Sequence, residues 1–438
     1  MDRPMTVYVR ALTTRRPLAF IVLFALIANV MLAVVVPKVE VWNDTEVAHI
    51  AASIANGQGF SSPYAHPSGP SAWIPPVYPY LLATILRVFG GFTATSYWIA
   101  IGMNIVVHAL TCVLLFWCAK DVFGPRVGWY SACALAGLPL FAYPLVLLHL
   151  VSFGGQGLLG LFISPKIIWY THLSELAIVL LIWFTLHPPH WVIYGTTWAA
   201  VSLLNPTILA LAPAFVAWRF RRRESWRYLG LTIAVAALCV TPWLVRNYFV
   251  FHRPVFIRDN FGVELRVGNQ PGNRGLLSRD VHPMSNEYEL SRLIELGEPE
   301  YSRVAGQEAL DSIRTHRGEF VRNTILRVGY FWLGTPMRSR LGSLAFVKYL
   351  PALTVSLLAF YGAVRSLRRS SESAFLFVAV LLFYPIVYYI THTNSGYFYQ
   401  YPIQPQMLAL AISVLVRQRT PQRSQGDHEA CGNESLPA

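Results

Sequence analysis

The sequence has 438 residues, of which 54% are hydrophobic and only 13% are charged. Soluble domains carry about 25% charged residues, so this composition excludes a soluble enzyme and indicates an integral membrane protein with several spans. The formal net charge of +13 does not indicate a nucleic-acid partner, because the arginines stand in short runs at the ends of apolar segments, where the lipid bilayer accounts for them.

The first apolar segment, residues 17–36, is long enough to cross a hydrocarbon core of about 30 Å as a helix. It lacks the small-residue cleavage site of a signal peptide, so we expect it to remain in the protein. Arginines precede this segment and form a second cluster at 219–227. The positive-inside rule predicts that both groups face the cytoplasm.

An odd number of spans must therefore lie between the first exit and the second arginine cluster. The candidates are 76–90, 97–118, 127–150, 167–186 and 192–218. This parity leaves Lys120 and Arg126 outside, which is a mild departure from the rule. A span ending near Val245 follows, and the later candidates are 341–364, 374–390 and 402–416. The sequence thus predicts an all-α polytopic membrane protein with about ten transmembrane helices.

These spans divide the chain into four parts. We expect a transmembrane module, a loop domain on the outer face, C-terminal transmembrane helices and a disordered cytoplasmic tail, at 1–245, 246–322, 323–416 and 417–438 respectively. The first part includes an outer loop at 37–75. Of the five cysteines, four lie in apolar segments and one in the tail, so the sequence offers no disulfide framework and no zinc spacing.

The first outer loop begins with the acidic stretch Asn43-Asp44-Thr45-Glu46 and continues as a short amphipathic helix, whose apolar face we expect to meet lipid. One interpretation is structural. Asn43 caps the helix, Glu46 completes a capping box, and the helix dipole stabilises the negative charge of Asp44 in the first turn. The other is catalytic, because a low-dielectric surface raises the pKa of a carboxylate toward the range of a general base.

Asp44 is followed by an Ile-Ala-x-x-Ile-Ala-x-Gly-x-Gly-Phe run and then by Pro75-Pro76-x-Tyr78-Pro79. Further motifs lie along most of the chain, at 241–248, 262–265, 268–271, 388–392 and 402–405. This series resembles bacterial membrane glycosyltransferases of family 39, which include the protein O-mannosyltransferases and the lipid A aminoarabinose transferases and belong to the GT-C superfamily. Together these motifs occur in the expected order and on one predicted side of the membrane.

The resemblance implies a GT-C-like bundle in a bacterial plasma membrane, with its active site on the outer, periplasmic face. It implies transfer of a hexose or pentose, with inversion, from a polyprenyl-phosphate donor to a hydroxyl of a glycan, lipid or protein. Asp44 would be the catalytic base, and Glu46 a supporting acid or the partner of a divalent metal. No cofactor is certain. The alternative is a transporter or flippase of lipid-linked glycans, which would need ionisable residues near mid-membrane; Glu175 and Lys166 are the main ones here.

The donor phosphate needs cationic partners, and arginines outnumber acids in the first half of the long outer loop. The candidates are Arg246, Arg253, Arg258 and Arg266, although Arg246 also suits a snorkelling role at a span end. The chain lacks the Glu-Lys-Pro and Arg-Tyr-Arg elements of related enzymes. Substrate candidates in or near the motifs are His49, Tyr78, Asn247, Asn269, Tyr397, Tyr399 and Gln400, with an interfacial belt as the alternative for the tyrosines.

Overall fold

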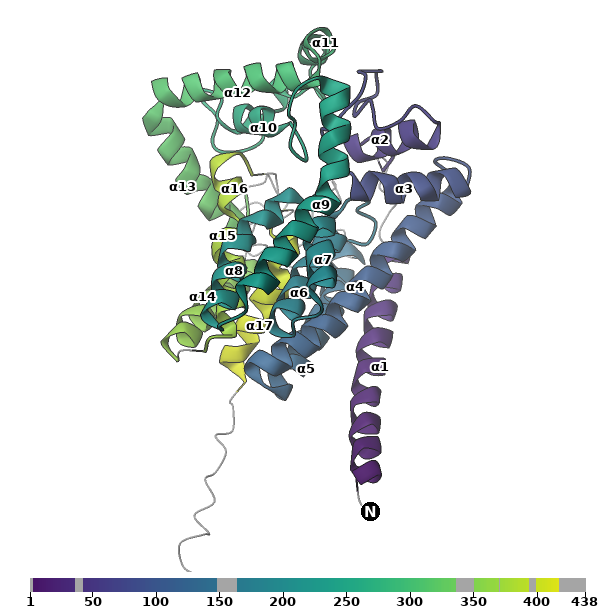
Figure 1. The fold of residues 1–438 in the computed structure, drawn as a ribbon, viewed down its shortest axis with the longest axis vertical. Helices are drawn as coiled ribbons and strands as arrows, with labels where there is room; N and C mark the ends of the chain where they lie inside the picture. The colour runs from purple at the N-terminus through teal and green to yellow at the C-terminus, as the bar shows by residue number, and fades with distance from the viewer. Residues whose placement is uncertain are drawn as a thin grey trace, which may run out of the picture.

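The computed structural model describes residues 3–35, 42–147, 164–335, 350–369, 371–393 and 399–416. These residues are helical and contain no strand beyond two isolated bridges, Ser61 with Pro70 and Leu276 with Thr393. Long helices form a bundle, and a layer of shorter helices covers one end of it (Figure 1). We call the end with this layer the upper end and the opposite end, where α1 begins, the lower end.

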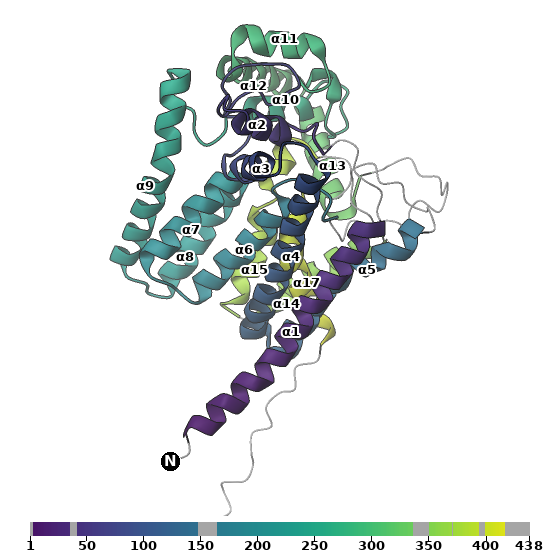
Figure 2. The ribbon, with the colours of Figure 1, turned by 90° about the vertical axis from the view of Figure 1, so that its right-hand side faces the viewer.

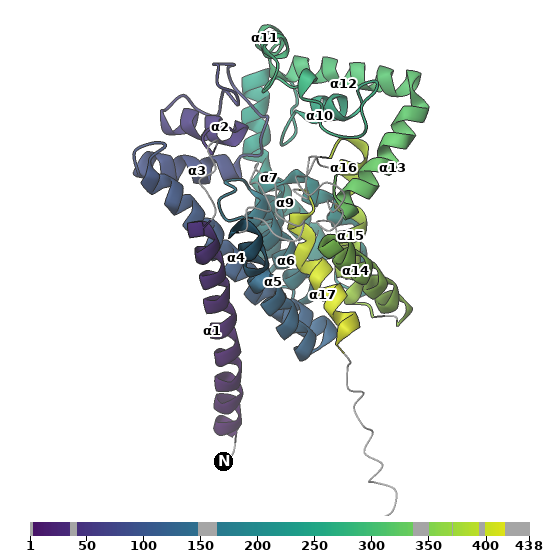
Figure 3. The same cartoon turned by 180° about the vertical axis from the view of Figure 1, so that it is seen from behind.

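The bundle and the upper layer are built from different parts of the chain. The bundle contains α1 Arg3–Val35, α4 Ala94–Phe123, α5 Pro125–Leu147, α6 Thr171–Leu186, α7 Trp191–Leu204, α8 Ala212–Arg221, α9 Trp226–Phe251, α14 Leu350–Arg368, α15 Ala374–Phe383, α16 Ile386–Ile390 and α17 Gln404–Leu415. The upper layer contains α2 Glu46–Ala55, α3 Val77–Val88, α10 Phe261–Gly268, α11 Glu287–Leu296 and α12 Glu298–Thr315, and α13 Arg317–Leu333 leads back to the bundle. Figure 2 and Figure 3 show the same division from the side and from behind.

Four of the described helices are long and apolar enough to cross a membrane: residues 16–35 of α1, and α4, α9 and α14. The expected number of about ten spans is therefore not confirmed. The helices at two expected spans, α3 and α17, have only 12 residues each. A helix of that length rises about 18 Å, which is short of the hydrocarbon thickness of about 30 Å.

The expected span at 76–90 is a helix of the upper layer. Figure 1 shows α3 beside α2, lying across the upper end of the bundle and not along it. The helix ends at Val88 because Gly90 and Gly91 both take positive φ angles, 78° and 83°, which the right-handed helix cannot contain. The chain then enters α4 from the upper end.

The expected span at 192–218 is also wrong, because the chain breaks in its middle and turns back. Helix α7 ends at Leu204, and Asn205 and Pro206 introduce a short 3-10 turn before α8 starts. Arg219 near the end of α8 donates a hydrogen bond from Nη1 to the Thr185 carbonyl, at 3.2 Å. Since α7 starts just after α6 ends, α7 and α8 enter from the lower end and return to it.

The position of α3 removes one expected crossing, and the return of α8 removes a second, so the number of crossings before the second arginine cluster stays odd. With one crossing fewer before them, Lys120 and Arg126 lie on the same side as that cluster, in agreement with the positive-inside rule. The α4–α5 turn lies at the lower end, because Asp121 there contacts His187 at the end of α6, with 3.2 Å between Oδ2 and Nε2. The arginines of the α8–α9 turn lie at this end as well. Lys120, Arg126 and the arginines of the α8–α9 turn therefore share one end, as the positive-inside rule expects of residues that flank spans on the cytoplasmic side.

This topology can be tested with single cysteines in a chain whose native cysteines are replaced by alanine. We expect Thr95→Cys, at the start of α4, to react with a membrane-impermeant maleimide from the same side as Glu287→Cys in α11. Arg223→Cys should react only from the opposite side. Labelling of Thr95→Cys together with Arg223→Cys would restore the span at 76–90 and contradict the observed fold.

Candidate active site at the upper end

Arg246 near the end of α9 holds the first outer loop in place. Its guanidinium donates hydrogen bonds to the Ser71 carbonyl at 2.7 Å and to the Phe60 carbonyl at 2.9 Å, and it lies over the Trp243 ring at 4.9 Å. The neighbouring Asn247 donates to the Phe256 carbonyl at 2.8 Å. The predicted phosphate contact Arg246 and the predicted substrate contact Asn247 therefore both form bonds that position loops.

The same loop is anchored on its other side by two buried acids. The amide of Ala72 donates to Oε1 of Glu298 at 2.5 Å, and the Ala72 carbonyl accepts from the Asp259 amide at 3.2 Å. Burial raises the pKa of Asp259 to about 6, and burial together with the nearby Asp259 charge raises the pKa of Glu298 well above its ordinary value. The loop is thus fixed between α9 and α12.

Helix α2 precedes this loop, and its first turn differs from the expected capping box. Its N-cap is Thr45, whose Oγ1 accepts a hydrogen bond from the Ala48 amide at 3.2 Å, so Glu46 is the first helical residue. The apolar residues Val47, Ile50 and Ala51 are fully buried in the protein core. The expectation that this face meets lipid was therefore wrong. Packing on the protein points the Glu46 side chain inward.

Glu46 is the acid of this region with properties suited to proton transfer. Its side chain is 14% exposed, and its Oε1 lies 3.9 Å from Nε2 of His282. Burial, and next the negative charge of Glu264, raise the pKa of Glu46 to about 7. His282 accepts a hydrogen bond at Nδ1 from the Met284 amide, 3.1 Å, so its proton sits on Nε2 and faces Glu46.

A charged cluster from α10 and the segment before it lies across from Glu46. Glu264 accepts hydrogen bonds at Oε1 from Arg258 at 3.2 Å and from Asn260 at 2.6 Å. Its Oε2 lies 3.3 Å from Nδ1 of His392, which comes from the C-terminal part of the chain. The buried Nε of Arg258 has no hydrogen-bond partner among the described residues, so this guanidinium retains a donor for an anion.

Tyrosines complete this region. Nε2 of His392 and the hydroxyl of Tyr399 are 2.9 Å apart, and the Tyr399 ring stacks on Tyr388 with 4.3 Å between centroids. Tyr170, the N-cap residue of α6, packs edge-on against Tyr78 at 6.5 Å. The charges of Arg258 and Glu264 act on Tyr170, which places its hydroxyl at the same cluster.

Asp44 and His49 form a separate pair at the rim. Oδ1 of Asp44 and Nε2 of His49 are 2.9 Å apart, and the Asp44 side chain is 64% exposed. The charge of His49 also acts on Glu46. The first-loop acids therefore lie in different surroundings: Asp44 faces solvent, and Glu46 faces the charged cluster.

Several other predicted contacts have partners outside this cluster. Arg253 pairs with Glu300 at 2.9 Å, and Arg266 forms two hydrogen bonds with the buried Glu289, at 2.7 and 2.8 Å. Asn269 accepts from Arg327 at 2.8 Å, and Gln400 donates to the Phe331 carbonyl at 3.0 Å. Tyr397 lies outside the described residues. The structure thus links Glu46, Arg258 and Tyr399 through Glu264 and His392, and Tyr78 meets this set through the Tyr170 ring. Arg253, Arg266, Asn269 and Gln400 bind other partners.

Some members of the cluster were not identified from the sequence. Glu264 and His392 stand in motifs of the family resemblance, which gives them no role of their own. His282 and Tyr170 carry no sequence signal, because they follow irregular segments far from the first loop. Only the fold shows that these residues share a site.

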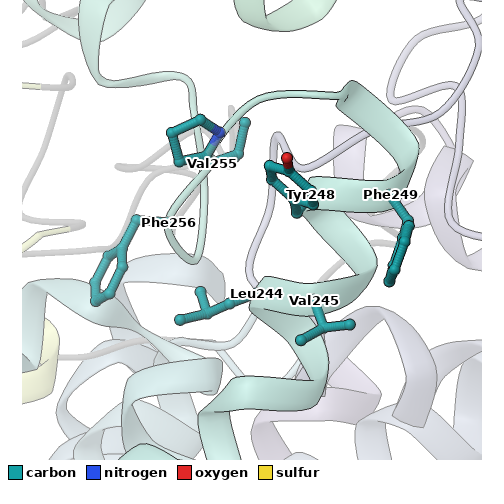
Figure 4. A pocket seen from close by; sticks show the side chains of 7 residues that line it. Leu244, Val245, Tyr248, Phe249, Val255 and Phe256 are labelled. Atoms are coloured by element: carbon teal, nitrogen blue, oxygen red, sulfur yellow. The ribbon is translucent and has the colours of Figure 1, made fainter.

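An apolar pocket of about 560 Å³ lies beside the upper end of α9 (Figure 4). Its walls are apolar and aromatic, and they are formed by Leu244, Val245, Tyr248, Phe249, Pro254, Val255 and Phe256. The hydrogen bond from Asn247 to Phe256 joins the two walls. Phe249 is 70% exposed, so the pocket opens to the surroundings of the protein.

The described residues contain one group of three side chains close enough to hold a metal ion, and it lies in the bundle: His108, His172 and Glu175. Glu46 and His282 at the upper end do not form such a group. Nδ1 of His282 already accepts a hydrogen bond, so its Nε2 carries the proton and not a free lone pair.

No protein-family model and no curated protein matches this sequence. Solved structures of the oligosaccharyltransferase from Archaeoglobus fulgidus are similar. The apo form has a TM-score of 0.48 and 14% identity over 91% of this chain and 50% of that chain. The complex with Zn and sulfate has a TM-score of 0.45 and 16% identity over 91% and 49%. The complex of this enzyme, AglB, with an inhibitory peptide and a dolichol-phosphate has a TM-score of 0.47 and 14% identity over 91% and 50%. The chain thus spans about half the length of these structures.

The loop-holding role of Arg246 predicts a loss of stability in Arg246→Lys. A lysine keeps the charge but cannot reach both the Ser71 and Phe60 carbonyls. We expect about 1–3 kcal/mol of destabilisation, seen as a lower midpoint of thermal unfolding in detergent. Arg253→Lys, at an exposed ion pair, is the matched control and should cost under about 1 kcal/mol. Equal midpoints for the two variants would contradict this role.

The raised pKa of Glu46 predicts a pH-dependent stability. The folded protein holds this proton more tightly than the unfolded chain, so stability falls as the pH rises from the ordinary value of 4.5 to about 7. The shift corresponds to about 3 kcal/mol. Glu46→Gln cannot titrate at this position and does not lose this stability. From about pH 5 to about pH 8, the unfolding midpoint of the variant should therefore rise relative to that of the wild type.

Glu287→Gln, at an exposed position of α11, is the control for this measurement and should follow the wild type at every pH. Asp259 and Glu298 titrate in both the wild type and the variant, so they do not affect the difference. Parallel curves for wild type and Glu46→Gln would show that Glu46 is not buried as described.

Proposed function

We propose that the protein is a GT-C-like membrane glycosyltransferase that transfers a sugar from a polyprenyl-phosphate donor to an acceptor hydroxyl at the outer face of a bacterial plasma membrane. The observation that carries this proposal is the cluster of Glu46, Arg258 and Glu264 at the upper end. It combines an acid with a pKa near neutrality and a guanidinium whose buried Nε has no hydrogen-bond partner among the described residues. Glu46 lies between Asp44 and the Ile-Ala run of the family 39 resemblance, and Arg258 lies in the outer loop between two of its motifs.

Glu46 is the general base in this proposal. A base is most effective when its pKa lies near the working pH, and the pKa of Glu46 is about 7. Ionised Glu46 takes the proton of the acceptor hydroxyl as the oxygen attacks the anomeric carbon. The bond from that carbon to the phosphate oxygen breaks, and polyprenyl phosphate leaves with the electron pair, so the configuration inverts.

Arg258 receives the leaving phosphate. Its pairing with Glu264 fixes the guanidinium, and its Nε, which no described residue binds, is the donor available to a phosphate oxygen. The other predicted arginines are engaged elsewhere, and Arg246 acts through the loop it holds. We assign sugar binding to the hydroxyls of Tyr170 and Tyr399, which belong to the same cluster.

The acceptor approaches past Asp44 in this arrangement. The exposed Asp44–His49 pair lies at the rim on the same loop as Glu46. The family resemblance puts the base on Asp44, whereas burial and pKa favour Glu46. We therefore assign acceptor binding to Asp44, which makes the two acids separable by experiment.

The apolar pocket beside α9 is the candidate site for the polyprenyl chain. It is lined by apolar and aromatic side chains, and it opens next to the turn of α9 that carries Arg246. A lipid-linked donor needs such a surface, because its chain stays in the bilayer while its phosphate reaches the polar site. A transporter of the same lipid would need it as well.

Transfer can be measured in proteoliposomes as release of polyprenyl phosphate from polyprenyl-phosphate mannose, glucose or aminoarabinose, with a soluble extract of envelope glycans as acceptor. We expect Glu46→Gln to lower turnover by about 100-fold or more with little change in KM. The wild-type rate should rise about tenfold per pH unit below pH 7 and level off above it. Glu287→Gln is the control and should retain full activity.

Asp44→Asn distinguishes the two acids. If Asp44 binds acceptor, this variant raises the acceptor KM and leaves the pH profile with its midpoint near 7. Loss of turnover in Asp44→Asn with normal turnover in Glu46→Gln would reverse the assignment. Movement of labelled lipid across the bilayer without any sugar release would favour the transporter.

A further inference from the structure

The interior of the bundle contains a polar cluster that the proposed reaction does not use. His108 comes from α4, and His172 and Glu175 come from the first turns of α6. All three residues are at most 4% exposed. One ligand atom from each lies within 4.8 Å of the other two. In hydrocarbon surroundings such groups are costly unless something balances them.

Both imidazoles have one nitrogen engaged by a backbone carbonyl. Nε2 of His108 lies 3.3 Å from the Leu135 carbonyl of α5, and Nε2 of His172 lies 3.3 Å from the Ser164 carbonyl. A carbonyl only accepts hydrogen bonds, so each Nε2 must carry a proton. The lone pair of each neutral ring is therefore on Nδ1. Metal-binding histidines are oriented in this way by an acceptor behind the ring.

The described contacts leave both Nδ1 atoms and one oxygen of the carboxylate outside any hydrogen-bond network. Nδ1 of His172 and Oε2 of Glu175 are buried with no hydrogen-bond partner among the described residues. Nδ1 of His108 lies 3.7 Å from Oε2 of Glu175, which is too long for a hydrogen bond. It is close to the separation of two ligands of one tetrahedral ion, about 3.3 Å for bonds of about 2.0 Å.

We propose that His108, His172 and Glu175 form a binding site for a divalent transition-metal ion, with zinc as the best fit, inside the helix bundle. Two imidazole nitrogens and one carboxylate are a ligand set that zinc uses. Alkaline-earth ions favour all-oxygen sites. The buried Cys112 lies one turn along α4 from His108 and interacts with it, which offers a fourth ligand.

The bound ion would join α4 to α6. His172 is two residues from Tyr170, whose hydroxyl lies at the upper cluster. The site therefore has a structural role: it fixes the start of α6 against its neighbour. It differs in residues and place from any metal that the upper end could hold.

The test uses the full-length protein with a tag that contains no histidine, stripped with a chelator in detergent and reloaded with cobalt or zinc. We expect the wild type to bind one ion per chain and to show the visible absorption of four- or five-coordinate cobalt. X-ray absorption of the zinc form should show two imidazoles and a carboxylate oxygen at about 2.0–2.1 Å. Zinc should also raise the unfolding midpoint of the wild type.

His172→Ala and Glu175→Gln should each weaken metal binding by more than about 100-fold. Loss of a residue that only hydrogen-bonds to a metal ligand costs about 10–100-fold, and loss of a ligand itself should cost more. His187→Ala, at the C-cap of α6, is the matched control, because its ring pairs with Asp121 outside the cluster. It should bind one ion like the wild type, as should His282→Ala at the upper end. If a variant does not fold, X-ray absorption of the wild type decides alone. A wild type that binds neither ion, or binds one without imidazole ligands, overturns the proposal.

Discussion

The attachment of residues 60–72 to α9 and α12 is the constraint from which the upper end follows. Arg246 holds the Phe60 and Ser71 carbonyls, and Glu298 and Asp259 hold both backbone groups of Ala72. Segments more than a hundred residues apart meet here through backbone groups that would otherwise be buried without partners. Because α2 precedes this anchored loop, its first residue is brought opposite α10.

The charge balance of the cluster explains why Glu46 is poised for proton transfer. Glu264 has one cation, Arg258, as its ion-pair partner, and His392 and Asn260 add polar contacts. A second carboxylate beside this pair finds its counter-charge already used, so burial and Glu264 favour its protonated form.

The sequence was informative where a single segment carries its own physics. The helices α1, α4, α9 and α14 follow from long apolar runs, and the basic lower end follows from the arginines. Two expected spans were wrong because apolar length was weighed above local breaks: Gly90-Gly91 ends α3, and Asn205-Pro206 ends α7. Both breaks are visible in the sequence. The residues around Glu46 were not predictable, because no periodicity relates residue 46 to residues 282 and 392. The number of arginines in the outer loop also did not show that Arg253 and Arg266 have acidic partners.

The two polar clusters of the protein share α6, and this arrangement explains why the helix starts where it does. Tyr170, its N-cap residue, makes no side-chain capping bond, so the usual local signal for a helix start is missing. Tertiary contacts replace it: Asn104 of α4 donates to the carbonyls of Pro165 and Ile167, and His172 faces the Ser164 carbonyl. The segment before α6 is therefore held by α4 and by the helix it precedes. An ion between His108 and His172 would act on the same joint, and through it on the position of the Tyr170 hydroxyl at the upper cluster.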